Sequence, residues 1–479
     1  MTRRKCGAKK CGTRAIPDPA PRLPPVEAIS NGDAPSSSKM TVSNVYAPLL
    51  ADIVGGRRNI FLTGRAGTGK TTLLRQIISA EQRKTVVLAP TGLAAVNVGG
   101  QTIHSFFNFP PRLLDAGDAR KLRNQRLVRS VETIIIDEVS MVRSDMMQAI
   151  DDTLRLNRND KRPFGGVRLI VSGDLSQLPP VVGGDVEHIL QATFGGPWFF
   201  RAPAFASGGF RLAALKRIFR QEDAGFIRIL NGLRNGRLSH EDEDILCGRV
   251  STRTSAEASL THVVLTPNNA AAWRINQMRL SELPGEARDY TASLEGQFEA
   301  KAFPTEEVLE LKPGARVMMI RNDPQGRWVN GSLGVVAALG ETDAFVQIGK
   351  EVHRVAQQAW EKFRYEFDAK TAAVTRSVIG SFKQLPLRLA YAVTIHKSQG
   401  MTLDRVHIDF DSGMFAHGQA YVAFSRCRSL EGLELSRPLR PRDIIIDRSA
   451  FELGRVETVA DGEHYYLADM IPPALQLQG

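Results

Sequence analysis

The chain of 479 residues lacks any apolar run of about eighteen residues, the length that a helix needs to cross a lipid bilayer. It has only four cysteines, at positions 6, 11, 247 and 427, which are too few and too widely spaced for a disulfide framework. Cys6 and Cys11 also make a poor zinc site, because such a site needs about four ligands and no second pair follows. We therefore expect no membrane span, no structural disulfides and a reducing, intracellular compartment.

Acidic residues are fewer than basic ones: the chain has 51 Asp and Glu and 62 Lys and Arg, which gives a formal net charge of +11. This surplus suits a polyanionic partner, although basic residues are also a common means of keeping a protein soluble. The first 40 residues hold eight Lys and Arg against three Asp and Glu, together with six prolines. Such a segment cannot bury enough apolar surface to offset the entropy of ordering it, so we expect a disordered basic tail at 1–40.

The remainder of the chain is too long for one hydrophobic core, and short β-branched runs alternate along it with helical stretches. The first set of these runs is 59–64, 85–90, 133–138 and 168–174, and the second is 261–269, 388–400 and 404–410. Continuous apolar strands separated by helices are typical of a parallel sheet that is covered on both faces. The pattern predicts an α/β protein with two doubly wound domains.

A different residue pattern interrupts the second set of runs. Residues 311–339 alternate apolar and polar side chains and contain glycine and proline breaks. This alternation predicts short antiparallel strands, which we interpret as a small β-barrel inserted into the second α/β domain.

Glycines are concentrated immediately after the first predicted strand. Residues 64–71, Gly-Arg-Ala-Gly-Thr-Gly-Lys-Thr, match the phosphate-binding pattern G-x-x-x-x-G-K-[ST] between a strand and a helix. The glycines let backbone N–H groups surround phosphates, and the helix N-terminus adds positive potential. The pattern predicts binding of a nucleoside triphosphate such as ATP, with Mg²⁺, at Gly64, Ala66, Gly67, Thr68, Gly69, Lys70, Thr71 and Thr72.

The chemistry of such a loop assigns individual roles. Lys70 can reach the β- and γ-phosphates, and the Thr71 hydroxyl can take a coordination position on Mg²⁺. Asp137 closes the apolar run at 133–136 and is predicted to hold the metal together with Thr71, while Glu138 is placed to deprotonate the attacking water. Two carboxylates at a strand end can also be merely solvated, but beside a phosphate-binding loop they predict an NTPase.

Six further stretches occur in a fixed order along the chain. They are APTGLAAVNVGGQTIHSFF (89–107), DEVSMV (137–142), GDLSQLPPV (173–181), IFRQED (218–223), AYAVTIHKSQGMTLD (390–404) and YVAFSRCRS (421–429). Together with the phosphate-binding loop, this series resembles the superfamily-one DNA helicases of the PIF/RecD type, from about residue 43 to about residue 450.

The resemblance implies an architecture and an activity. It implies two RecA-like domains that bind ATP in the cleft between them, and translocation along single-stranded DNA in the 5′-to-3′ direction with unwinding of duplex. The expected partners are single-stranded DNA and junctions with duplex, the expected processes are DNA repair, recombination or replication, and we expect a monomer without a membrane partner. A bacterial protein of this kind is expected in the cytoplasm at the nucleoid, and a eukaryotic one in the nucleus or a mitochondrion.

The same resemblance carries roles onto matching positions. Gln177 corresponds to the residue that senses the γ-phosphate, and Arg220 and Arg426 correspond to arginine fingers from the second domain. A guanidinium is planar and always charged, so it suits the transferring phosphoryl group. The positions that match DNA contacts are Thr91, His104, Ser105 and Phe106 in the first domain and Thr394, His396, Lys397 and Gln399 in the second. Hydroxyls and cations suit phosphates and rings suit bases, although His104 is equally compatible with a packed core histidine.

The expected domain limits follow from these motifs. They are a tail at 1–40, a first RecA-like domain at 41–200 with a small strand-separating insertion near 108–130, a second RecA-like domain at 201–310 and 386–452, an SH3-like β-barrel insertion at 311–385, and a C-terminal tail at 453–479.

One position departs from the family pattern. Members carry a glutamine upstream of the phosphate-binding loop that reads adenine, whereas the first glutamine of this chain is Gln76, inside the helix after the loop. The base can then be held by backbone groups or by stacking, and other nucleotides become acceptable. Two other readings stay open at this point: a regulatory P-loop ATPase that shares only the ATPase core, and a nucleic-acid-binding module that has lost hydrolysis.

Overall fold

The computed structural model describes residues 41–368, 373–410 and 413–471, and the account below refers to these parts of the chain. The expected basic tail at 1–40, with Cys6 and Cys11, lies outside the described residues. Within the described parts, none of the helices is both long and apolar enough to cross a membrane.

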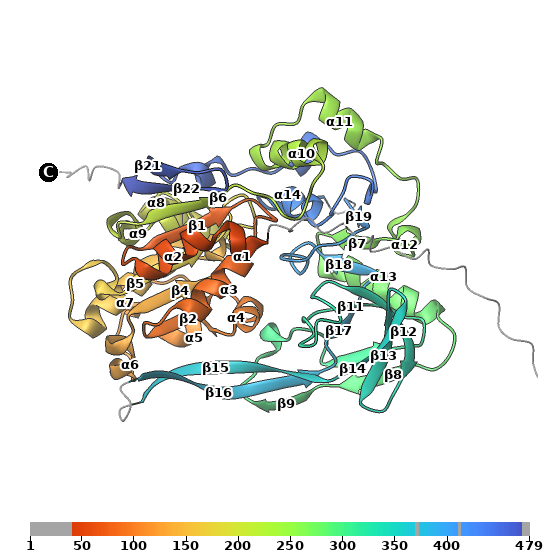
Figure 1. Ribbon diagram of the computed structural model, residues 1–479, viewed down its shortest axis with the longest axis horizontal. Helices are drawn as coiled ribbons and strands as arrows, with labels where there is room; N and C mark the ends of the chain where they lie inside the picture. Colours follow the sequence, from red (N-terminus) through yellow and green to blue (C-terminus); the bar gives the residue numbers. More distant parts are fainter. Residues whose placement is uncertain (1–40, 369–372, 411–412, 472–479) are drawn as a thin grey trace, which may run out of the picture. The chain divides into compact units, whose positions relative to one another are not determined.

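The first domain is built on an eight-stranded sheet with the strand order β21-β22-β6-β1-β5-β4-β2-β3 (Figure 1). Its strands β1 to β6 are mutually parallel where they pair. Their bounds are β1 (Ile60–Gly64), β2 (Thr85–Ala89), β3 (Gln101–Thr102), β4 (Thr133–Ile136), β5 (Arg168–Ser172) and β6 (Arg211–Leu215). This is the doubly wound parallel sheet that the apolar runs predict, and ligands of such sheets bind beyond the carboxyl ends of the strands.

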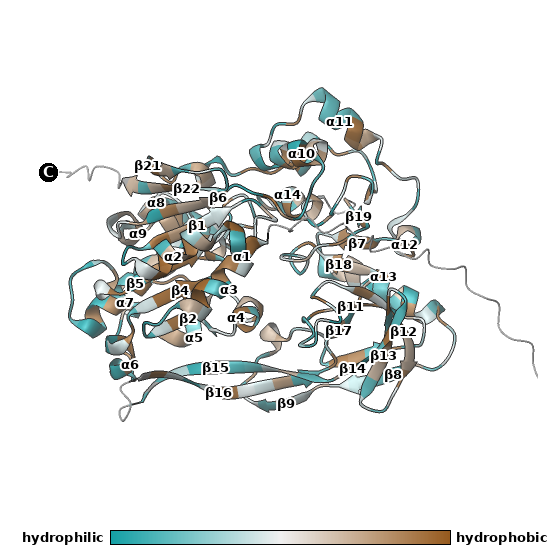
Figure 2. Cartoon of the chain, viewed as in Figure 1, coloured by the Kyte–Doolittle hydropathy of each residue, from teal (hydrophilic) through white to brown (hydrophobic). Residues whose placement is uncertain are grey.

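Both faces of this sheet are buried because its strands are apolar at consecutive positions. Ile60 and Leu62 of β1 pack on one face against α2 and α3, and Phe61 packs on the other face against α7 and α9. Figure 2 shows hydrophobic residues in β4 of this sheet. The helices of the domain are α1 (Val42–Val45), α2 (Ala47–Gly55), α3 (Lys70–Ala80), α4 (Gly92–Val98), α5 (Ile103–Phe107), α6 (Gln125–Ser130), α7 (Ser144–Arg158), α8 (Gly184–Phe194) and α9 (Pro203–Ser207).

The C-terminal segment differs from the expected tail at 453–479. Strands β21 (Arg455–Asp461) and β22 (Tyr465–Ile471) form an antiparallel hairpin, and β22 pairs antiparallel with β6. The reason is an alternating pattern in β22, which sends Leu467 to one core and Ala468 to the other. Since β6 also pairs with β1, the first domain includes residues beyond its expected limit at 200.

The second domain has a smaller parallel sheet with the order β18-β7-β19-β20. Its strands are β7 (Val263–Thr266), β18 (Ala392–Thr394), β19 (Val406–Ile408) and β20 (Leu433–Leu435). Helices of this domain are α10 (Ala224–Asn235), α11 (His240–Cys247), α12 (Ser255–Ala258), α13 (Asn269–Glu282) and α14 (Gln419–Phe424). The β7 and β18 runs are far apart in sequence, which fits a domain interrupted by an insertion.

The insertion consists of antiparallel strands, as the alternating pattern predicts. Five strands follow the order β14-β13-β12-β11-β17, three the order β15-β16-β9 and two pair as β10-β8. Their bounds are β8 (Arg288–Thr291), β9 (Ser293–Gly296), β10 (Val308–Leu311), β11 (Arg316–Met319), β12 (Leu333–Leu339), β13 (Asp343–Ile348), β14 (Glu351–Ala356), β15 (Gln358–Asp368), β16 (Ala373–Gln384) and β17 (Leu387–Leu389). Closure of these strands into an SH3-like barrel stays a prediction.

The long hairpin of β15 and β16 contacts the first domain. The Tyr365 hydroxyl accepts a hydrogen bond from the backbone N–H of Val87 in β2 at 3.1 Å, and Arg376 donates to the Gly99 carbonyl at 3.0 Å. Hydrophilic residues occupy most of β15 in Figure 2. The predicted insertion near 108–130 contains α6, and its Leu122 and Leu127 are buried in the first-domain core.

Candidate nucleotide and DNA site

The phosphate-binding loop runs from the end of β1 to the start of α3, as the motif predicts. Gly67 and Gly69 have positive φ angles of 80° and 84°. A Cβ atom on Gly67 would lie 2.7 Å from the Cβ of Arg220, so any larger residue would collide as well as being strained. The two glycines therefore let the loop turn tightly while Arg220 stays in contact with it.

Lys70 is the first residue of α3, and its ammonium group is held by the loop itself. The Nζ atom donates to the carbonyls of Gly64 and Arg65 at 2.7 and 3.0 Å. Burial lowers the pKa of Lys70, while the negative charges of Asp174 and Glu138 oppose this effect. Gly64, expected among the nucleotide-binding residues, thus holds Lys70 through its carbonyl and is not itself a lining residue of the cavity described below.

Asp137 and Glu138 follow the end of β4 and form the acidic part of the site. Glu138 adopts a left-handed backbone conformation with φ of 51°, and its N–H donates to Oδ1 of Asp137 at 2.9 Å. Burial raises the pKa of Asp137, although the Glu138 N–H and the Ser172 hydroxyl oppose the rise. Burial, together with the adjacent Asp137 charge, raises the pKa of Glu138 to about 7. A carboxylate that titrates near neutral pH is well matched to general-base catalysis.

Two arginines that follow β6 in the chain line the same site. Arg220 donates to the carbonyls of Ser425 and Gly400 at 3.1 and 3.4 Å, and Nε of Arg426 donates to the carbonyl of Val422 at 2.9 Å. Burial lowers the pKa of Arg220 to about 10 and that of Arg426 to about 9, and the Arg220 charge adds to the effect on Arg426. Among the described residues, neither guanidinium forms an ion pair with a carboxylate, so both are available to an anionic ligand.

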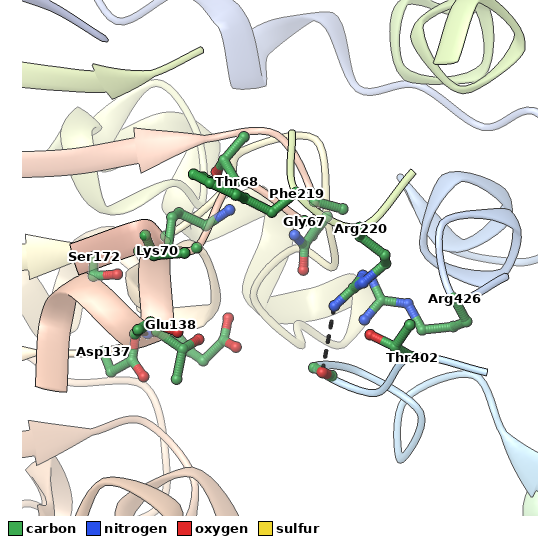
Figure 3. A pocket seen from close by; sticks show the side chains of 18 residues that line it. Gly67, Thr68, Lys70, Asp137, Glu138, Ser172, Phe219, Arg220, Thr402 and Arg426 are labelled. Atoms are coloured by element: carbon green, nitrogen blue, oxygen red, sulfur yellow. Dashed lines mark hydrogen bonds between the residues drawn. The ribbon is translucent and has the colours of Figure 1, made fainter. Parts of the chain in front are cut away.

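One cavity of about 330 Å³ brings these groups together (Figure 3). Its lining includes residues 66–72, Asp137, Glu138 and Gln177 from the first domain, Gly400, Thr402 and Arg426 from the second, and Arg220 from the segment between β6 and α10. Gln177 is 7% exposed, and its amide donates to Oδ2 of Asp174 at 3.0 Å. Every residue that the sequence nominates for catalysis therefore lines a single cavity.

The donor set also fits a magnesium ion. Thr71 and Asp137 both line the cavity, and a hydroxyl with a carboxylate are ligands that Mg²⁺ accepts. Within the described residues, no group of three or more His, Cys, Asp and Glu side chains is arranged to hold a metal. A magnesium ion at this site would therefore share its remaining positions between substrate phosphates and water.

The lining of the cavity also includes two apolar side chains, Val42 of α1 and Phe219. Phe219 packs edge-to-face on Tyr46, with ring centroids 6.0 Å apart. Gln76 is the glutamine nearest to the phosphate-binding loop in sequence, but its amide donates to the Ser43 hydroxyl at 2.5 Å and its oxygen is buried. Val42 and Phe219 therefore offer surfaces for stacking on a base, and Gln76 is not placed to read its edge.

Two residues belong to the site that sequence reasoning did not place there. Gln399 was expected beside DNA, but its Nε2 donates to Oε2 of Glu138 at 3.2 Å and to Oε1 of Gln177 at 3.1 Å. The buried Tyr421 hydroxyl accepts a hydrogen bond from the N–H of Ala66 in the phosphate-binding loop at 2.8 Å. Gln399 and Tyr421 both lie inside the motifs given above, so the sequence marks their neighbourhood as functional. It does not indicate which group each side chain contacts, because those contacts form only where distant parts of the chain meet.

The candidate DNA residues of the first domain sit after β2 and in α5. Thr91 caps the N-terminus of α4 by accepting from the Ala94 N–H at 3.2 Å. Burial and the nearby Arg143 charge lower the pKa of His104. Phe106 contacts the Tyr365 ring of the β15–β16 hairpin at 6.3 Å. The Phe106 ring is therefore already in contact with the insertion in this structure.

The candidates of the second domain follow the end of β18. Thr394 is buried, and its hydroxyl accepts from the Lys397 N–H at 3.3 Å. The His396 ring stacks on Phe415 with centroids 6.2 Å apart, and Phe415 is 63% exposed. Burial lowers the pKa of Lys397, and the Arg388 charge adds to this. The exposed Phe415 ring, stacked on His396, offers the kind of face on which a base of a single nucleic-acid strand can stack.

Comparison with known sequences gives a consistent result. Residues 44–244 match the family model described as PIF1-like helicase. The chain is 35% identical over 410 residues to the ATP-dependent DNA helicase Pif1 of Bdellovibrio bacteriovorus, covering 83% of this chain and 88% of that protein. It is 35% identical over 429 residues to the human ATP-dependent DNA helicase PIF1, covering 87% of this chain and 63% of the human protein.

Solved structures agree with the sequence matches. Unliganded Pif1 from Bacteroides is 34% identical, with 86% of this chain and 96% of that chain covered and a TM-score of 0.79. The complex of Bacteroides Pif1 with ADP-AlF4 also has a TM-score of 0.79 at the same identity and coverage. The structure of Bacteroides Pif1 bound to single-stranded DNA has a TM-score of 0.61, again at the same identity and coverage.

Proposed function

The chain belongs to the PIF1-like helicase family, and we propose that it is an ATP-dependent DNA helicase that moves 5′ to 3′ along single-stranded DNA and unwinds duplex ahead of it. The observation that carries the proposal is the composition of the cavity. The first domain supplies the phosphate-binding loop and the acids, the second supplies Arg426, and Arg220 comes from the segment that connects the two. Such a site is complete only when both domains meet, which is how hydrolysis is linked to domain movement.

The side chains support hydrolysis of the terminal phosphate of ATP. The phosphate-binding loop and Lys70 would hold the β- and γ-phosphates, and Glu138 would accept the proton of the attacking water. Arg220 and Arg426 would stabilise charge on the transferring phosphoryl group. A Mg²⁺ ion held by Thr71 and Asp137 would neutralise charge on the bound phosphates.

Single-stranded DNA is the proposed track, and junctions with duplex are the proposed substrate. Thr91, His104 and Phe106 in the first domain and Thr394, His396 and Lys397 in the second are the proposed contacts. Hydroxyls and cations among them suit phosphates, and the rings suit stacked bases. The net charge of +11 favours a polyanionic partner such as DNA over a basic one. We further propose that the protein acts as a monomer in DNA repair, recombination or replication.

The competing readings explain less of the cavity. A regulatory P-loop ATPase has no need of motifs from both domains around one nucleotide, and a binding module without hydrolysis has no need of a general base. Burial and the Asp137 charge raise the pKa of Glu138 to about 7, and Gln177 lines the same cavity as the two arginines. These features favour an active, two-domain enzyme.

The first experiment measures ATPase rates with and without single-stranded DNA. We expect DNA to stimulate hydrolysis, and we expect Lys70→Ala and Glu138→Gln to abolish turnover while Glu138→Gln still binds nucleotide. Lys350→Ala and Glu341→Gln, at exposed turn positions, are the matched controls and should leave turnover unchanged. A rate that is indifferent to DNA would favour the regulatory ATPase instead.

Strand displacement then tests the direction of movement. A duplex with a 5′ single-stranded overhang should be unwound in the presence of ATP, and a duplex with only a 3′ overhang should not. The reverse preference would contradict the proposed direction but leave the ATPase assignment intact.

A further inference from the structure

The segment 394–401 connects the two kinds of site. It begins at the end of β18 with the proposed DNA contacts Thr394, His396 and Lys397, and it ends in the nucleotide cavity. At its far end Arg220 donates to the carbonyl of Gly400 at 3.4 Å (dashed line in Figure 3). Arg426 donates to the carbonyls of Ser398 and Met401 at 3.5 and 3.4 Å. Both arginine fingers are therefore hydrogen-bonded to this segment.

Gln399 extends the same segment to the first domain. Its amide nitrogen has two N–H donors, and these reach Glu138 at 3.2 Å and Gln177 at 3.1 Å. The bond to Glu138 is charge-assisted when that carboxyl group is ionised. One side chain of the second domain thus holds both the proposed general base and the proposed γ-phosphate sensor of the first.

The segment is short and internally bonded, so a displacement at one end reaches the other. The Ser398 hydroxyl donates to the carbonyl of Ile395 at 2.7 Å, and its N–H donates to the carbonyl of Thr394 at 3.0 Å. The Gln399 N–H donates to the carbonyl of His396 at 3.2 Å. A strand that moves His396 or Lys397 therefore moves Gln399 with it, because consecutive turns lock them together.

We propose that Gln399 is a positioning residue that couples DNA binding at residues 394–397 to the placement of Glu138 and Gln177 in the nucleotide site. The inference rests on the proposed helicase function, because it needs DNA to occupy the first half of the segment. In this role Gln399 contacts neither the attacking water nor the phosphates. It fixes the positions of Glu138 and Gln177, which make those contacts.

The coupling has a measurable form, which is the ratio of the ATPase rate with saturating single-stranded DNA to the rate without DNA. Gln399→Ala removes both donors and should lower this ratio by about tenfold, within the usual range for coupling between two sites. The fall should appear in kcat, and the KM for ATP and the Kd for a fluorescent single-stranded oligonucleotide should stay within about twofold of wild type. Gln325→Ala, at an exposed position of the insertion, is the matched control.

A second variant covers the case in which Gln399→Ala fails to fold. Gln399→Glu keeps the size of the side chain but replaces its N–H donors with oxygen, so it should lose coupling to a similar extent. An unaltered ratio in either folded variant would overturn the proposal, and so would an equal loss of nucleotide binding. If wild-type hydrolysis ignores DNA, the helicase function itself fails, and that outcome is distinct from the failure of Gln399.

Discussion

Replacing Arg426 tests whether catalysis needs both domains. The side chain is 1% exposed, shares its cavity with Glu138 and Lys70, and has no carboxylate partner among the described residues. Arginine fingers are worth roughly 10³–10⁵ in rate, or about 4–7 kcal/mol of transition-state stabilisation. We expect Arg426→Ala to reduce kcat at saturating DNA by a factor in this range, while ATP binding measured by a fluorescent analogue persists.

Lysine at the same position should rescue activity poorly, because its side chain differs from arginine in two ways. Burial and the Arg220 charge lower the pKa of Arg426 to about 9. A lysine has a lower pKa than an arginine to begin with, so the same burial and charge favour its uncharged form more strongly. A lysine also lacks the planar fork of donors that a guanidinium offers. The activity of Arg426→Lys relative to wild type should therefore rise as pH falls from about 8 to 6.

The control for both variants is two residues away. Arg428 is also an arginine, but its side chain is 61% exposed and pairs with Asp404 at the surface. Arg428→Ala should change kcat by less than about twofold, since exposed ion pairs contribute little. Thermal unfolding of each variant separates a folding defect from a catalytic one. Rates within a few-fold of wild type for a folded Arg426→Ala protein would refute the two-domain active site.

Three further outcomes are expected. Because the pKa of Glu138 is raised to about 7 and a general base must be deprotonated, kcat should fall as pH drops through about 7, and a flat profile between pH 6 and 8 would contradict that role. Removing residues 1–40, with their surplus of five positive charges, should weaken DNA binding at low salt but leave the saturated ATPase rate unchanged; loss of maximal turnover would show a structural role. Because Val42 and Phe219 offer stacking surfaces, the rate of DNA-stimulated hydrolysis of GTP should lie within about tenfold of that of ATP, and Phe219→Ala should raise the KM for both nucleotides. Strict selection of ATP would instead reveal a group that reads the edge of the base.

The part of the site that sequence reasoning predicted is the part set by local chemistry. The phosphate-binding loop, Asp137 and Glu138 depend on one strand end each, so a short pattern specifies them. The roles of Arg220 and Arg426 come from the resemblance alone; both side chains line the cavity, and their part in catalysis stays a prediction. Runs of apolar residues were enough to predict the parallel sheets. That prediction does not require knowing which strand pairs with which.

What was missed depends on contacts between distant parts of the chain. The Tyr421 hydroxyl meets the Ala66 N–H across 355 positions of sequence, and Gln399 meets Glu138 across 261. No periodicity or local motif indicates such a pairing. The expectation of a tail at 453–479 is wrong because the sequence of β22 does not reveal its partner, which is the edge of β6 about 250 residues earlier.

The pairing of β22 with β6 has a consequence for the order in which the protein assembles. Tyr465 pairs with Leu215, so the hydrogen bonds along this side of β6 form only after residues about 250 positions later have been synthesised. Until they emerge from the ribosome, the backbone of β6 has no neighbour on that side, and an unpaired strand edge invites association with other chains. The amino-terminal domain therefore finishes folding only after the second domain has been made. A fragment that stops near residue 244, although it contains the whole family match, should be recovered in soluble form only when a peptide spanning the hairpin is supplied with it.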